Sequence, residues 1–534
     1  MNTTTHPCRI ALVAALTITV AATAAHAAGT NAEHLAIASG PFQPTWDSLE
    51  SQYQTPEWFR DAKFGIWAHW GAQCQPEQGD WYARNMYMQG SPDYKYQVST
   101  YGHPSTNGFK DVINAWKADQ FDPERLIALY KKAGAKYFVM MANHHCNFDN
   151  FDSTYQPWNS TKIGPKKDLV GMWEKATRKE GLRFGVTVHA GRAWSWYEVA
   201  QGADTNGPMK GIPYDGKLTK ADGKGLWWDG LDPQALYAQD HAKGATPDAA
   251  YCDKFFLRTK ELMDKYRPDL VYFDDSVLPL KGASEAYGLR LAAHYYNSSA
   301  KQHGQNEAVM NTKRLDERQR KALVWDIERG KSDRIEPLPW QTDTCIGSWH
   351  YKRSIFDKHG YKTAAQVVPM LVDIVSKNGN LLLSIPVRGN GAIDADEEQF
   401  LSDMAAWIAV NGEGIYGTRP WKTFGEGPSV AIKEANRFGG VKDTQSQPFT
   451  PEDIRFTQKG ETVFAFVHAW PADGKVLIKS IGTDAKLYAG EVGKVELLGS
   501  KSPVKWQRSA AGLAVELPPQ KPCAHAYTIK ITPR

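Results

Sequence analysis

The chain has 534 residues, of which 42% are hydrophobic and 23% are charged, and its formal net charge is +4. This length exceeds that of a usual single domain, so we expect one large domain and a smaller one. The charge is small and forms no basic stripe, which argues against a nucleic-acid partner. Tryptophan is abundant, with 19 residues. Most of these rings are expected to fill the core, and some suit stacking on the apolar face of a sugar.

The N-terminus has the features of an export signal. Arg9 precedes an apolar stretch over residues 10–25, and residues 25–27 read Ala-His-Ala, a small-x-small cleavage site. We therefore predict that residues 1–27 are a signal peptide and that the mature protein is periplasmic or secreted. The stretch is too short and too rich in Ala and Thr for a stable membrane span.

Cysteines are few and scattered after this segment. Their number is odd and none forms a C-x-x-C pair, so the chain is not a disulfide scaffold, and at most one or two bridges are expected. The five positions are Cys74, Cys146, Cys252, Cys345 and Cys523.

Four short apolar runs each lead into ionisable side chains. Buried strands of a parallel sheet are continuous apolar runs rather than alternating ones. In a (β/α)8 barrel, the residues just past the carboxyl end of each strand converge on the face where the chemistry takes place. We therefore predict a polar pocket of His and Asp at that face. The runs are 63–68 before His69, 137–141 before His144 and His145, 183–188 before His189, and 270–273 before Asp274 and Asp275.

Helical segments with clear start and stop signals separate these runs. One opens at Asp122, with Pro123 in its first turn, and ends at Gly134. Two more are expected over residues 168–181 and 248–266. The repeated order of helix, strand and polar residue predicts parallel βα units.

Four later runs bring the number of expected strands to eight, as a (β/α)8, or TIM, barrel requires. Alternation of strands and helices alone also permits a doubly wound sheet. The later runs are residues 308–311, 323–326, 345–349 and 381–385.

The longest interruption of the pattern covers residues 200–245 and is rich in Gly, Asp, Lys and Trp. A loop this long within a compact barrel is usually functional or disordered. Trp227, Trp228 and Tyr237 favour a binding loop, and the alternative is a solvent-exposed loop without a binding role.

The character of the sequence changes after residue 421. A segment rich in Gly and Pro, 425–428, is followed by short alternating runs with turn residues between them, which predicts a small β-sandwich. We expect residues 28–424 to form the barrel domain and residues 425–534 the sandwich. The expected sandwich strands are 463–467, 475–478, 494–498 and 526–531.

Two carboxylates at different strand ends are candidates for catalysis. Asp274 follows an apolar run, and Glu328 follows another, with Gly330 after it to let the chain turn away. Either residue alone could be a helix cap or an ion-pair partner. Together they suit glycoside hydrolysis, in which one carboxylate attacks and the other protonates the leaving oxygen. The proton donor needs a raised pKa, from burial or from the neighbouring carboxylate.

The adjacent His144 and His145 raise the question of a metal site. Adjacent side chains diverge from an extended backbone, and no H-x-H or H-E-x-x-H spacing accompanies them. A neutral imidazole offers one donor and one acceptor, which suits sugar hydroxyls better. We therefore expect no metal and no cofactor. We expect His69 and His189 to bind sugar hydroxyls in the same way.

These residues lie in motifs that closely resemble those of the α-L-fucosidases of glycoside hydrolase family 29. The resemblance extends over about residues 56–421 and, weakly, over the sandwich. The matching segments are 63–71, KFGIWAHWG, against the family's KFGIFxHWG; 143–148, NHHCNF, against KHHDGF; 271–274, VYFD, in the strand that carries the nucleophile; and the late segments 376–383 and 411–416.

The resemblance implies a retaining mechanism, with Asp274 as the nucleophile and Glu328 as the general acid/base. It implies a fucosylated oligosaccharide or glycoconjugate as the substrate. It also implies that Tyr272 and Trp349 flank the fucose ring and its C6 methyl group. The residues implied to hold the fucose hydroxyls are His69, Asp80, Trp81, His144 and His145.

Several positions depart from the family pattern. His189 stands where the family has a Tyr, and Lys313 where it has an Arg, which removes a bidentate contact. We retain both as substrate-binding candidates. Residues 340–341 read Trp-Gln where many members have Trp-Glu, which removes a rival acid and favours Glu328. The reserve candidates for the acid/base role are Glu336 and Asp343.

We therefore predict an exported, exo-acting, retaining α-L-fucosidase. One alternative is a carbohydrate-binding protein on a degenerate hydrolase barrel, against which the two carboxylates argue. Another is a glycosidase for a related sugar such as α-L-galactose. Room near Trp349 for a hydroxyl in place of the C6 methyl group would favour that sugar.

Overall fold

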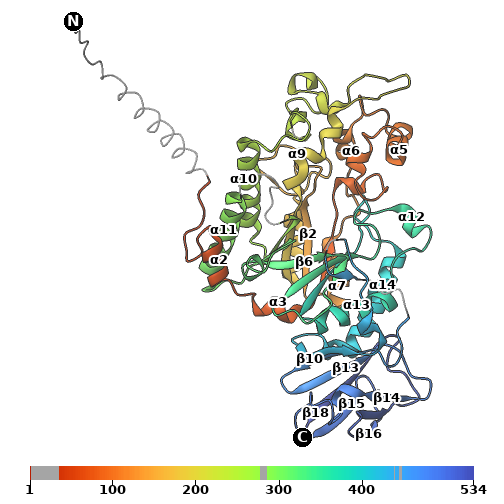
Figure 1. Cartoon of the computed structure of the whole chain (residues 1–534). Helices are drawn as coiled ribbons and strands as arrows, with labels where there is room; N and C mark the ends of the chain where they lie inside the picture. Colours follow the sequence, from red (N-terminus) through yellow and green to blue (C-terminus); the bar gives the residue numbers. More distant parts are fainter. Residues whose placement is uncertain (2–34, 238, 277–284, 438, 444–447) are drawn as a thin grey trace.

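A barrel domain forms the middle of the molecule (Figure 1). The excursion over residues 200–245 lies at one end and the C-terminal β domain at the other. Apart from Met1, the predicted signal peptide lies outside the described residues. The structure, a computed structural model, describes Met1 and residues 35–237, 239–276, 285–437, 439–443 and 448–534.

Eight parallel strands close into a barrel in the order β1-β2-β3-β4-β5-β6-β8-β9. The last strand pairs with the first, with Ile66 opposite Leu383. This closure confirms the TIM-type barrel and excludes the doubly wound sheet, which has two open edges. The strands are β1 (Phe64–Ala68), β2 (Tyr137–Asn143), β3 (Arg183–Val188), β4 (Leu270–Ser276), β5 (Val309–Lys313), β6 (Val324–Glu328), β8 (Trp340–Cys345) and β9 (Gly379–Ser384).

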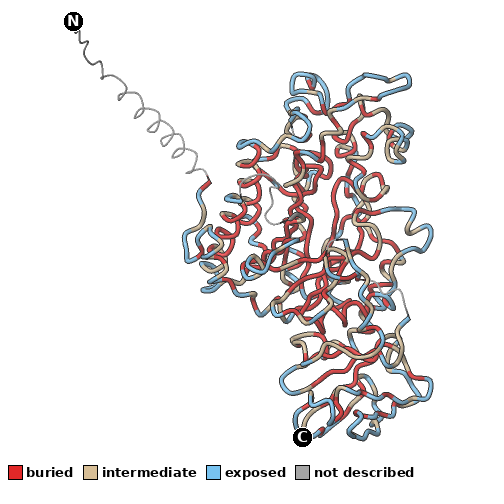
Figure 2. The backbone as a smooth tube through the Cα atoms, in the orientation of Figure 1, coloured by how far each residue is buried: buried red, intermediate tan, exposed pale blue. Residues whose placement is uncertain are grey.

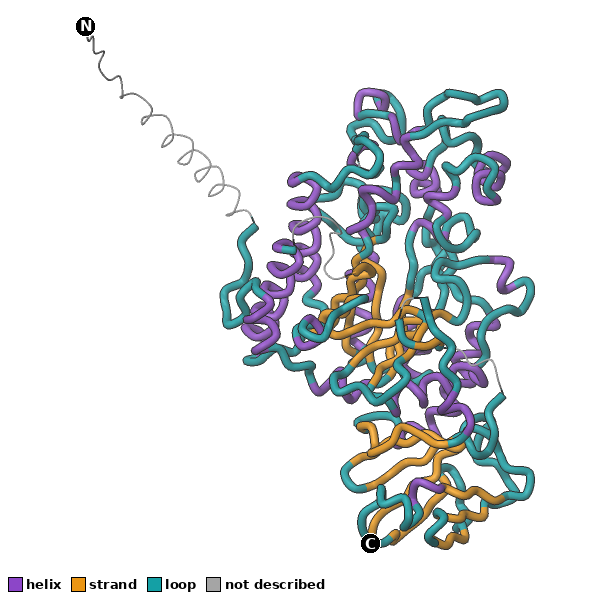
Figure 3. Tube along the Cα trace, viewed as in Figure 1, coloured by secondary structure: helices purple, strands orange, loops and turns teal. Residues whose placement is uncertain are grey.

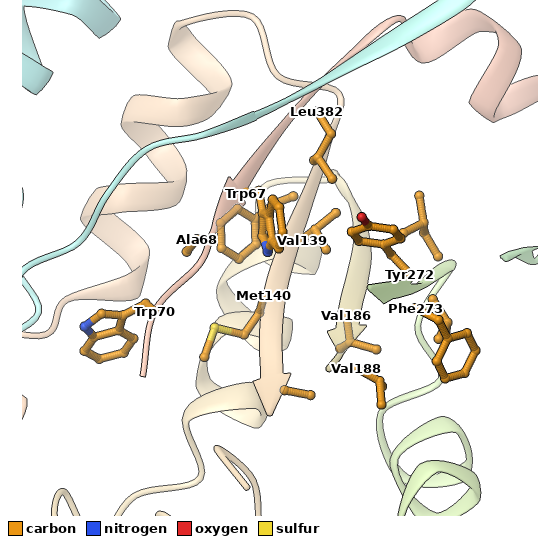
Figure 4. Close-up of a cluster of buried hydrophobic side chains, with 14 of the residues drawn as sticks. Trp67, Ala68, Trp70, Val139, Met140, Val186, Val188, Tyr272, Phe273 and Leu382 are labelled. Atoms are coloured by element: carbon orange, nitrogen blue, oxygen red, sulfur yellow. The ribbon is translucent and has the colours of Figure 1, made fainter. Parts of the chain in front are cut away.

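The barrel strands are apolar because both of their faces are covered. Every residue of β1, β2 and β9 is buried, as expected for strands with helices outside and side chains inside. Within the barrel, the rings of Trp67 and Tyr272 lie 5.8 Å apart between centroids. Figure 4 shows these rings among aliphatic side chains of neighbouring strands. The packed interior gives the cavity above it a solid floor.

Helices cover the outside of the barrel (Figures 1 and 3), and the three predicted helices are present as α7, α8 and α10. In α7 the carboxylate of Asp122 caps the first turn by accepting a hydrogen bond from the N–H of Arg125 at 3.0 Å. The helices are α2 (Trp46–Gln52), α3 (Glu57–Ala62), α4 (Tyr82–Asn85), α5 (Pro92–Thr100), α6 (Phe109–Ala115), α7 (Pro123–Lys132), α8 (Leu169–Lys179), α9 (Ala193–Trp196), α10 (Ala249–Tyr266), α11 (Ala286–His303), α12 (Arg353–Phe356), α13 (Ala364–Ser376) and α14 (Ala395–Asn411).

The prediction for the seventh barrel strand is wrong. The segment 345–349 is the last residue of β8 and the bend after it. β8 itself has the polar sequence WQTDTC, yet all of its residues are buried. They are tolerated because polar partners inside the barrel satisfy them. For example, Gln341 donates from Nε2 to Oδ2 of Asp326 at 2.7 Å.

The 200–245 excursion packs against the barrel domain. Its Asp215 is fully buried and accepts hydrogen bonds from the hydroxyls of Tyr87 at 2.7 Å and Tyr237 at 2.6 Å. Lys110 pairs with the same carboxylate at 3.2 Å. These bonds make the centre of the excursion a folded cap. Its short 3-10 helices are η3 (Glu198–Gln201), η4 (Asp215–Lys217), η5 (Lys220–Gly223) and η6 (Pro233–Ala235).

The C-terminal domain is a two-sheet β-sandwich, as predicted. The sheet β10-β12-β13-β18-β15 and the sheet β14-β17-β16 contribute to one core, for example through Phe456 and Val515. The boundary predicted after residue 424 lies within β10 and stays a prediction. The strands are β10 (Arg419–Glu426), β12 (Ile454–Lys459), β13 (Thr462–Val467), β14 (Lys475–Ile478), β15 (Val492–Leu497), β16 (Lys505–Arg508), β17 (Leu513–Glu516) and β18 (Tyr527–Pro533).

A buried ion cluster lies where the two domains meet. Asp373 of α13 pairs with Nε of Arg455 in β12 at 2.6 Å, with Nζ of Lys377 at 2.8 Å and with Nζ of Lys331 at 3.1 Å. Burial alone would raise the pKa of Asp373, but the three cations outweigh it and hold the pKa well below its ordinary value. Buried segments lie on both sides of this junction (Figure 2).

Within the described part of the chain, no helix combines the length and the apolar character needed to cross a bilayer. The five cysteines of the described residues are free thiols.

Candidate active site

A cavity of about 570 Å³ lies at the carboxyl ends of the barrel strands, the face where (β/α)8 enzymes carry their chemistry. Almost all of the predicted site residues line it, and the exceptions are His189 and Tyr272. No described residue of the 200–245 excursion lines it. The predicted residues that do are His69, Asp80, Trp81, His144, His145, Asp274, Lys313, Glu328 and Trp349.

Asp274, in β4, presents a partly exposed carboxylate to the cavity. Its Oδ2 accepts a hydrogen bond from Nδ1 of His189 at 2.9 Å, and its Oδ1 accepts one from the ammonium group of Lys313. Burial alone would raise the pKa of Asp274. The charge of Lys313 and the hydrogen bond from His189 outweigh burial and hold this pKa well below its ordinary value. Asp274 is therefore an ionised carboxylate that can act as a nucleophile.

His189 has protein partners at both of its ring nitrogens. Nδ1 donates to the carboxylate of Asp274, which can only accept, and Nε2 lies 2.9 Å from the hydroxyl of Thr187. Its side chain is fully buried. His189 therefore contacts the Asp274 carboxylate instead of lining the cavity.

Lys313, at the end of β5, joins the two candidate catalytic carboxylates. Its Nζ donates to Oε2 of Glu328 at 2.7 Å and to Oδ1 of Asp274. Burial alone would lower the pKa of Lys313, but the surrounding carboxylates, Asp274 foremost, raise it well above its ordinary value. Because both oxygens bind one nitrogen, they lie at most about 6 Å apart, which is two hydrogen-bond lengths.

A second pair of carboxyl groups lies beside these residues. Asp343 lines the cavity from β8, and its Oδ2 accepts a hydrogen bond from the Tyr272 hydroxyl at 3.1 Å. Burial raises the pKa values of Asp343 and of its neighbour Asp326, and the charge of Asp343 raises that of Asp326 further. Both shifts favour the protonated form, so the two buried carboxyl groups titrate as a pair at higher pH than an isolated aspartate.

Tyr272 also differs from its predicted place. It is fully buried and does not line the cavity. Its hydroxyl contacts Asp343 and lies 3.5 Å from Oδ1 of Asp274. In this structure Tyr272 supports the carboxylates from below, whereas a flanking contact with the sugar ring requires a place in the cavity wall.

Two neighbouring histidines offer ring nitrogens of opposite character. Burial lowers the pKa of His145 to about 3 and the pKa of His144 well below its ordinary value, so both rings are neutral. His145 donates from Nδ1 to the backbone oxygen of His189 at 2.7 Å, which makes its Nε2 an acceptor. Gln73 donates to Nδ1 of His144 at 2.7 Å, which makes the Nε2–H of His144 a donor.

His69 is the least satisfied polar group in the cavity wall. It is buried, and neither of its ring nitrogens has a hydrogen-bond partner among the described residues. Burial lowers its pKa well below the ordinary value. A neutral ring with one free donor and one free acceptor suits a ligand that carries hydroxyl groups.

The walls of the cavity combine an anchored carboxylate with aromatic rings. Asp80 accepts hydrogen bonds from the backbone N–H of His350 at 2.7 Å and from the hydroxyl of Ser348 at 2.9 Å. Trp81 is 51% exposed and has a φ of 67°, in the left-handed region. Trp349 packs on Trp67 with ring centroids 5.2 Å apart. Such flat surfaces suit the apolar faces of sugars.

In the part of the chain that the structure describes, two groups of residues bring metal-ligand atoms within 4.8 Å of one another: His69 with His144 and His189, and His145 with His189 and Asp274. Both ring nitrogens of His189 already bind protein atoms, and so does Nδ1 of His144. A metal bound through His189 would have to break one of these bonds. The donor pattern fits sugar hydroxyls better.

Some residues that line the cavity were not predicted from the sequence. Glu336, a reserve candidate for the acid/base role, lies outside the cavity. His350 lines the cavity, and its position directly after Trp349 is a signal that could have identified it. Glu336 does not line the cavity; its carboxylate binds Arg320 at 2.7 Å and Ser332 at 2.6 Å. Asp343, the other reserve, does line it. The remaining unpredicted lining residues are Trp67, Arg192, Arg314, Arg329 and Arg437.

A closed (β/α)8 barrel with two carboxylates from different strands at one cavity, beside a wall of neutral imidazoles, is an arrangement that suits glycoside hydrolysis. Comparison with known proteins agrees. Residues 30–413 match the sequence model described as "Alpha-L-fucosidase", and residues 445–532 match "Alpha-L-fucosidase C-terminal domain". The chain therefore belongs to the α-L-fucosidase family.

Relatives match over nearly the whole chain. The tissue alpha-L-fucosidase of Homo sapiens is 27% identical over 511 residues, covering 92% of both proteins. The plasma alpha-L-fucosidase of Rattus norvegicus is 27% identical and covers 93% of this chain and 95% of its own. A crystal structure of Thermotoga maritima alpha-fucosidase in complex with fucose has a TM-score of 0.66 and 25% identity, covering 92% of this chain and all of that one.

Proposed function

We propose that the protein is an exported, exo-acting, retaining α-L-fucosidase that removes terminal α-L-fucose from glycans. One observation carries the proposal: Asp274 and Glu328, from different strands, both bind Nζ of Lys313 at the cavity. Retaining glycosidases hold their two carboxyl groups about 5–5.5 Å apart, and inverting enzymes about 6.5–9.5 Å. The shared nitrogen favours the shorter separation.

Recognition of the sugar follows from the neutral histidines. The Nε2–H of His144 donates to a fucose hydroxyl oxygen, and Nε2 of His145 accepts from a hydroxyl. His69 supplies a further donor and acceptor, and Asp80 accepts from a hydroxyl. Trp349 offers an apolar surface for the C6 methyl group.

In the first step the carboxylate of Asp274 attacks C1 of the fucose. The bond from C1 to the aglycone oxygen breaks as the carboxylic acid of Glu328 gives its proton to that oxygen. The products are a fucosyl ester on Asp274 and the free aglycone. The low pKa of Asp274 keeps its carboxylate ionised for this attack.

In the second step the Glu328 carboxylate takes a proton from water as the water oxygen attacks C1. The ester bond to Asp274 breaks, which releases α-L-fucose with its original anomeric configuration and restores both carboxyl groups. Export through residues 1–27 would deliver this activity to the periplasm or the exterior.

The experiment that tests the proposal uses Asp274→Gly with an aryl α-L-fucoside. We expect turnover to be lost while the sugar still binds, and added azide to restore part of the activity by attacking C1 in place of the carboxylate. Full activity of the variant would contradict the proposal. An aryl α-L-galactoside, assayed beside the fucoside, tests the related sugar.

A further inference from the structure

Four arginines at the cavity have no part in the cleavage reaction. We call them the arginine rim: Arg192, Arg314, Arg329 and Arg437. Arg192 ends the short helix η2 (Ala190–Arg192) after β3, Arg314 follows β5, and Arg329 follows β6. Arg437 lies in the segment between β10 and β11 (Val441–Lys442). Segments far apart in the sequence therefore place cations around one opening.

The acidic groups of the cavity are engaged elsewhere. Asp274 and Glu328 share Lys313, and the Asp80 carboxylate accepts bonds from the 348–350 segment. Among the described residues, no carboxylate pairs with Arg314 or Arg329. Arg314 and Arg437 are exposed and Arg192 and Arg329 are half-buried, whereas the side chains of Asp274 and Glu328 are only 20% and 15% exposed.

Two members of the arginine rim, Arg329 and Arg437, lie in segments that contact Glu328 or its direct neighbours. The guanidinium of Arg329 stacks on Trp349, 4.7 Å from the ring centroid, and its backbone N–H donates to the oxygen of Asp343 at 2.8 Å. Asn436, beside Arg437, donates from its side chain to the backbone oxygen of Glu328 at 2.9 Å. β11 also pairs with β7 (Gly330–Lys331), just after Glu328.

Because the arginine rim lies next to Glu328, the role of Glu328 indicates which part of a substrate contacts the rim. The general acid contacts the leaving oxygen, so its surroundings belong to the aglycone. Fucose and a neutral aglycone carry no charge, so their polar groups need no cluster of cations. Planar guanidinium groups instead bind oxyanions through paired, charge-assisted hydrogen bonds.

We propose that the arginine rim binds an anionic substituent, a sulfate ester or a carboxylate, on the aglycone sugar from which fucose is removed. This inference rests on the proposed function. The cations also raise the local concentration of an anionic substrate through their long-range field, an effect that salt screens.

The test compares one neutral fucosyl disaccharide with two matched substrates, one with a 6-O-sulfate and one with a uronic acid as the reducing sugar. We expect kcat/KM for at least one anionic substrate to exceed that for the neutral one by about tenfold at low ionic strength. Added salt should reduce this ratio. The sulfate and carboxylate substrates identify which oxyanion the site prefers.

Arg314→Gln and Arg329→Gln, alone and combined, test the residues. The double variant should bring the ratio close to one. Arg125→Gln, an exposed arginine of α7 that pairs with Glu398, is the matched control and should keep the wild-type ratio. Thermal unfolding shows that each variant is folded.

The two proposals fail in different ways. No fucose released from any substrate would contradict the proposed function. Fucose release from all three substrates with equal kcat/KM would contradict anion binding by the arginine rim. So would a preference for an anionic substrate that the double variant keeps unchanged. Neither result would contradict the proposed fucosidase activity.

Discussion

Asp274 and Glu328 lie on β4 and β6, which are not neighbours in the barrel, and the strand between them carries the cation that joins them. Lys313 ends β5, so its Nζ reaches both carboxylates at once. Lys313 is the largest of the influences that lower the pKa of Asp274, and the hydrogen bond from His189 adds to it. Several consequences can be measured.

Lys313→Met should shift the acid limb of the pH profile upward. Lys313 helps to hold the pKa of Asp274 well below its ordinary value, so its removal lets Asp274 take up a proton at higher pH, where the nucleophile is then lost. We also expect kcat/KM at neutral pH to fall about 100-fold. The measurement is kcat/KM for an aryl α-L-fucoside against pH. Lys313→Arg, which keeps the charge, should retain an acid limb near that of wild type, and an unshifted limb in Lys313→Met would be evidence against this role.

His69→Phe should increase the stability of the free protein and weaken the binding of L-fucose. Because both ring nitrogens of His69 are buried and unpartnered among the described residues, an apolar ring should stabilise the free protein by about 1 kcal/mol. The same change should abolish the increase in unfolding temperature that L-fucose produces. Thermal unfolding with and without L-fucose measures both effects.

His468 provides the control for that variant. It is buried in the sandwich with both ring nitrogens unpartnered among the described residues, and it stacks on Phe449 with centroids 4.4 Å apart. His468→Phe should stabilise the protein to a similar extent and leave activity unchanged. If His69→Phe still responded to L-fucose like wild type, His69 would not contact the sugar.

Asp326→Asn should change how stability depends on pH. Burial and the charge of Asp343 raise the folded-state pKa of Asp326 above its unfolded value of about 3.9. The stability that this group contributes is complete below that unfolded pKa and is lost as pH rises towards the folded pKa. The amide cannot titrate, so the variant should gain free energy of unfolding relative to wild type as pH rises from about 4 to 7.

Urea denaturation at several pH values measures this difference. Asp326→Ala is the companion variant, because it leaves the Asp343 oxygen and the Gln341 amide without their partner and should cost about 1–3 kcal/mol. A constant difference between wild type and Asp326→Asn across the pH range would show that the two carboxyls do not titrate as such a pair.

In the ion cluster between the domains, we expect loss of the single anion, Asp373, to reduce stability more than loss of one of its cations. Asp373→Ala leaves Lys331, Lys377 and Arg455 buried together without a counter-charge and should destabilise the protein by about 3–5 kcal/mol. Arg455→Met should cost less, because two lysines still neutralise Asp373. Chemical denaturation compares the two variants. An equal or greater loss in Arg455→Met would refute this expectation.

The sequence predicted the barrel because most of its strands are buried on both faces and are therefore apolar. β8 was misplaced because it carries Gln341 and Asp343 into the interior, where the polar side chains of β6 and β4 satisfy them. Such pairing between strands depends on register, which a single segment does not reveal.

As with the barrel strands, most residues of the candidate site were predicted from the sequence and a few were not. Residues directly after apolar runs, such as His69 and Asp274, were found from their position. Tyr272 and His189 were assigned to the sugar, but their side chains lie within the barrel and contact Asp274. Arg437 could not be found, because it reaches the cavity from a segment that follows the last barrel strand.

The most direct test of a covalent intermediate on Asp274 is its capture. The protein is treated with an activated 2-deoxy-2-fluoro-L-fucoside, digested and analysed by mass spectrometry. The fluorine slows both steps, and the activated leaving group keeps formation of the ester faster than its hydrolysis, so the ester accumulates. The account predicts a fluorofucosyl label on the peptide that contains Asp274 and none in Asp274→Gly. A label on another carboxylate such as Asp343, or release of fucose with inverted configuration and no label, would contradict it.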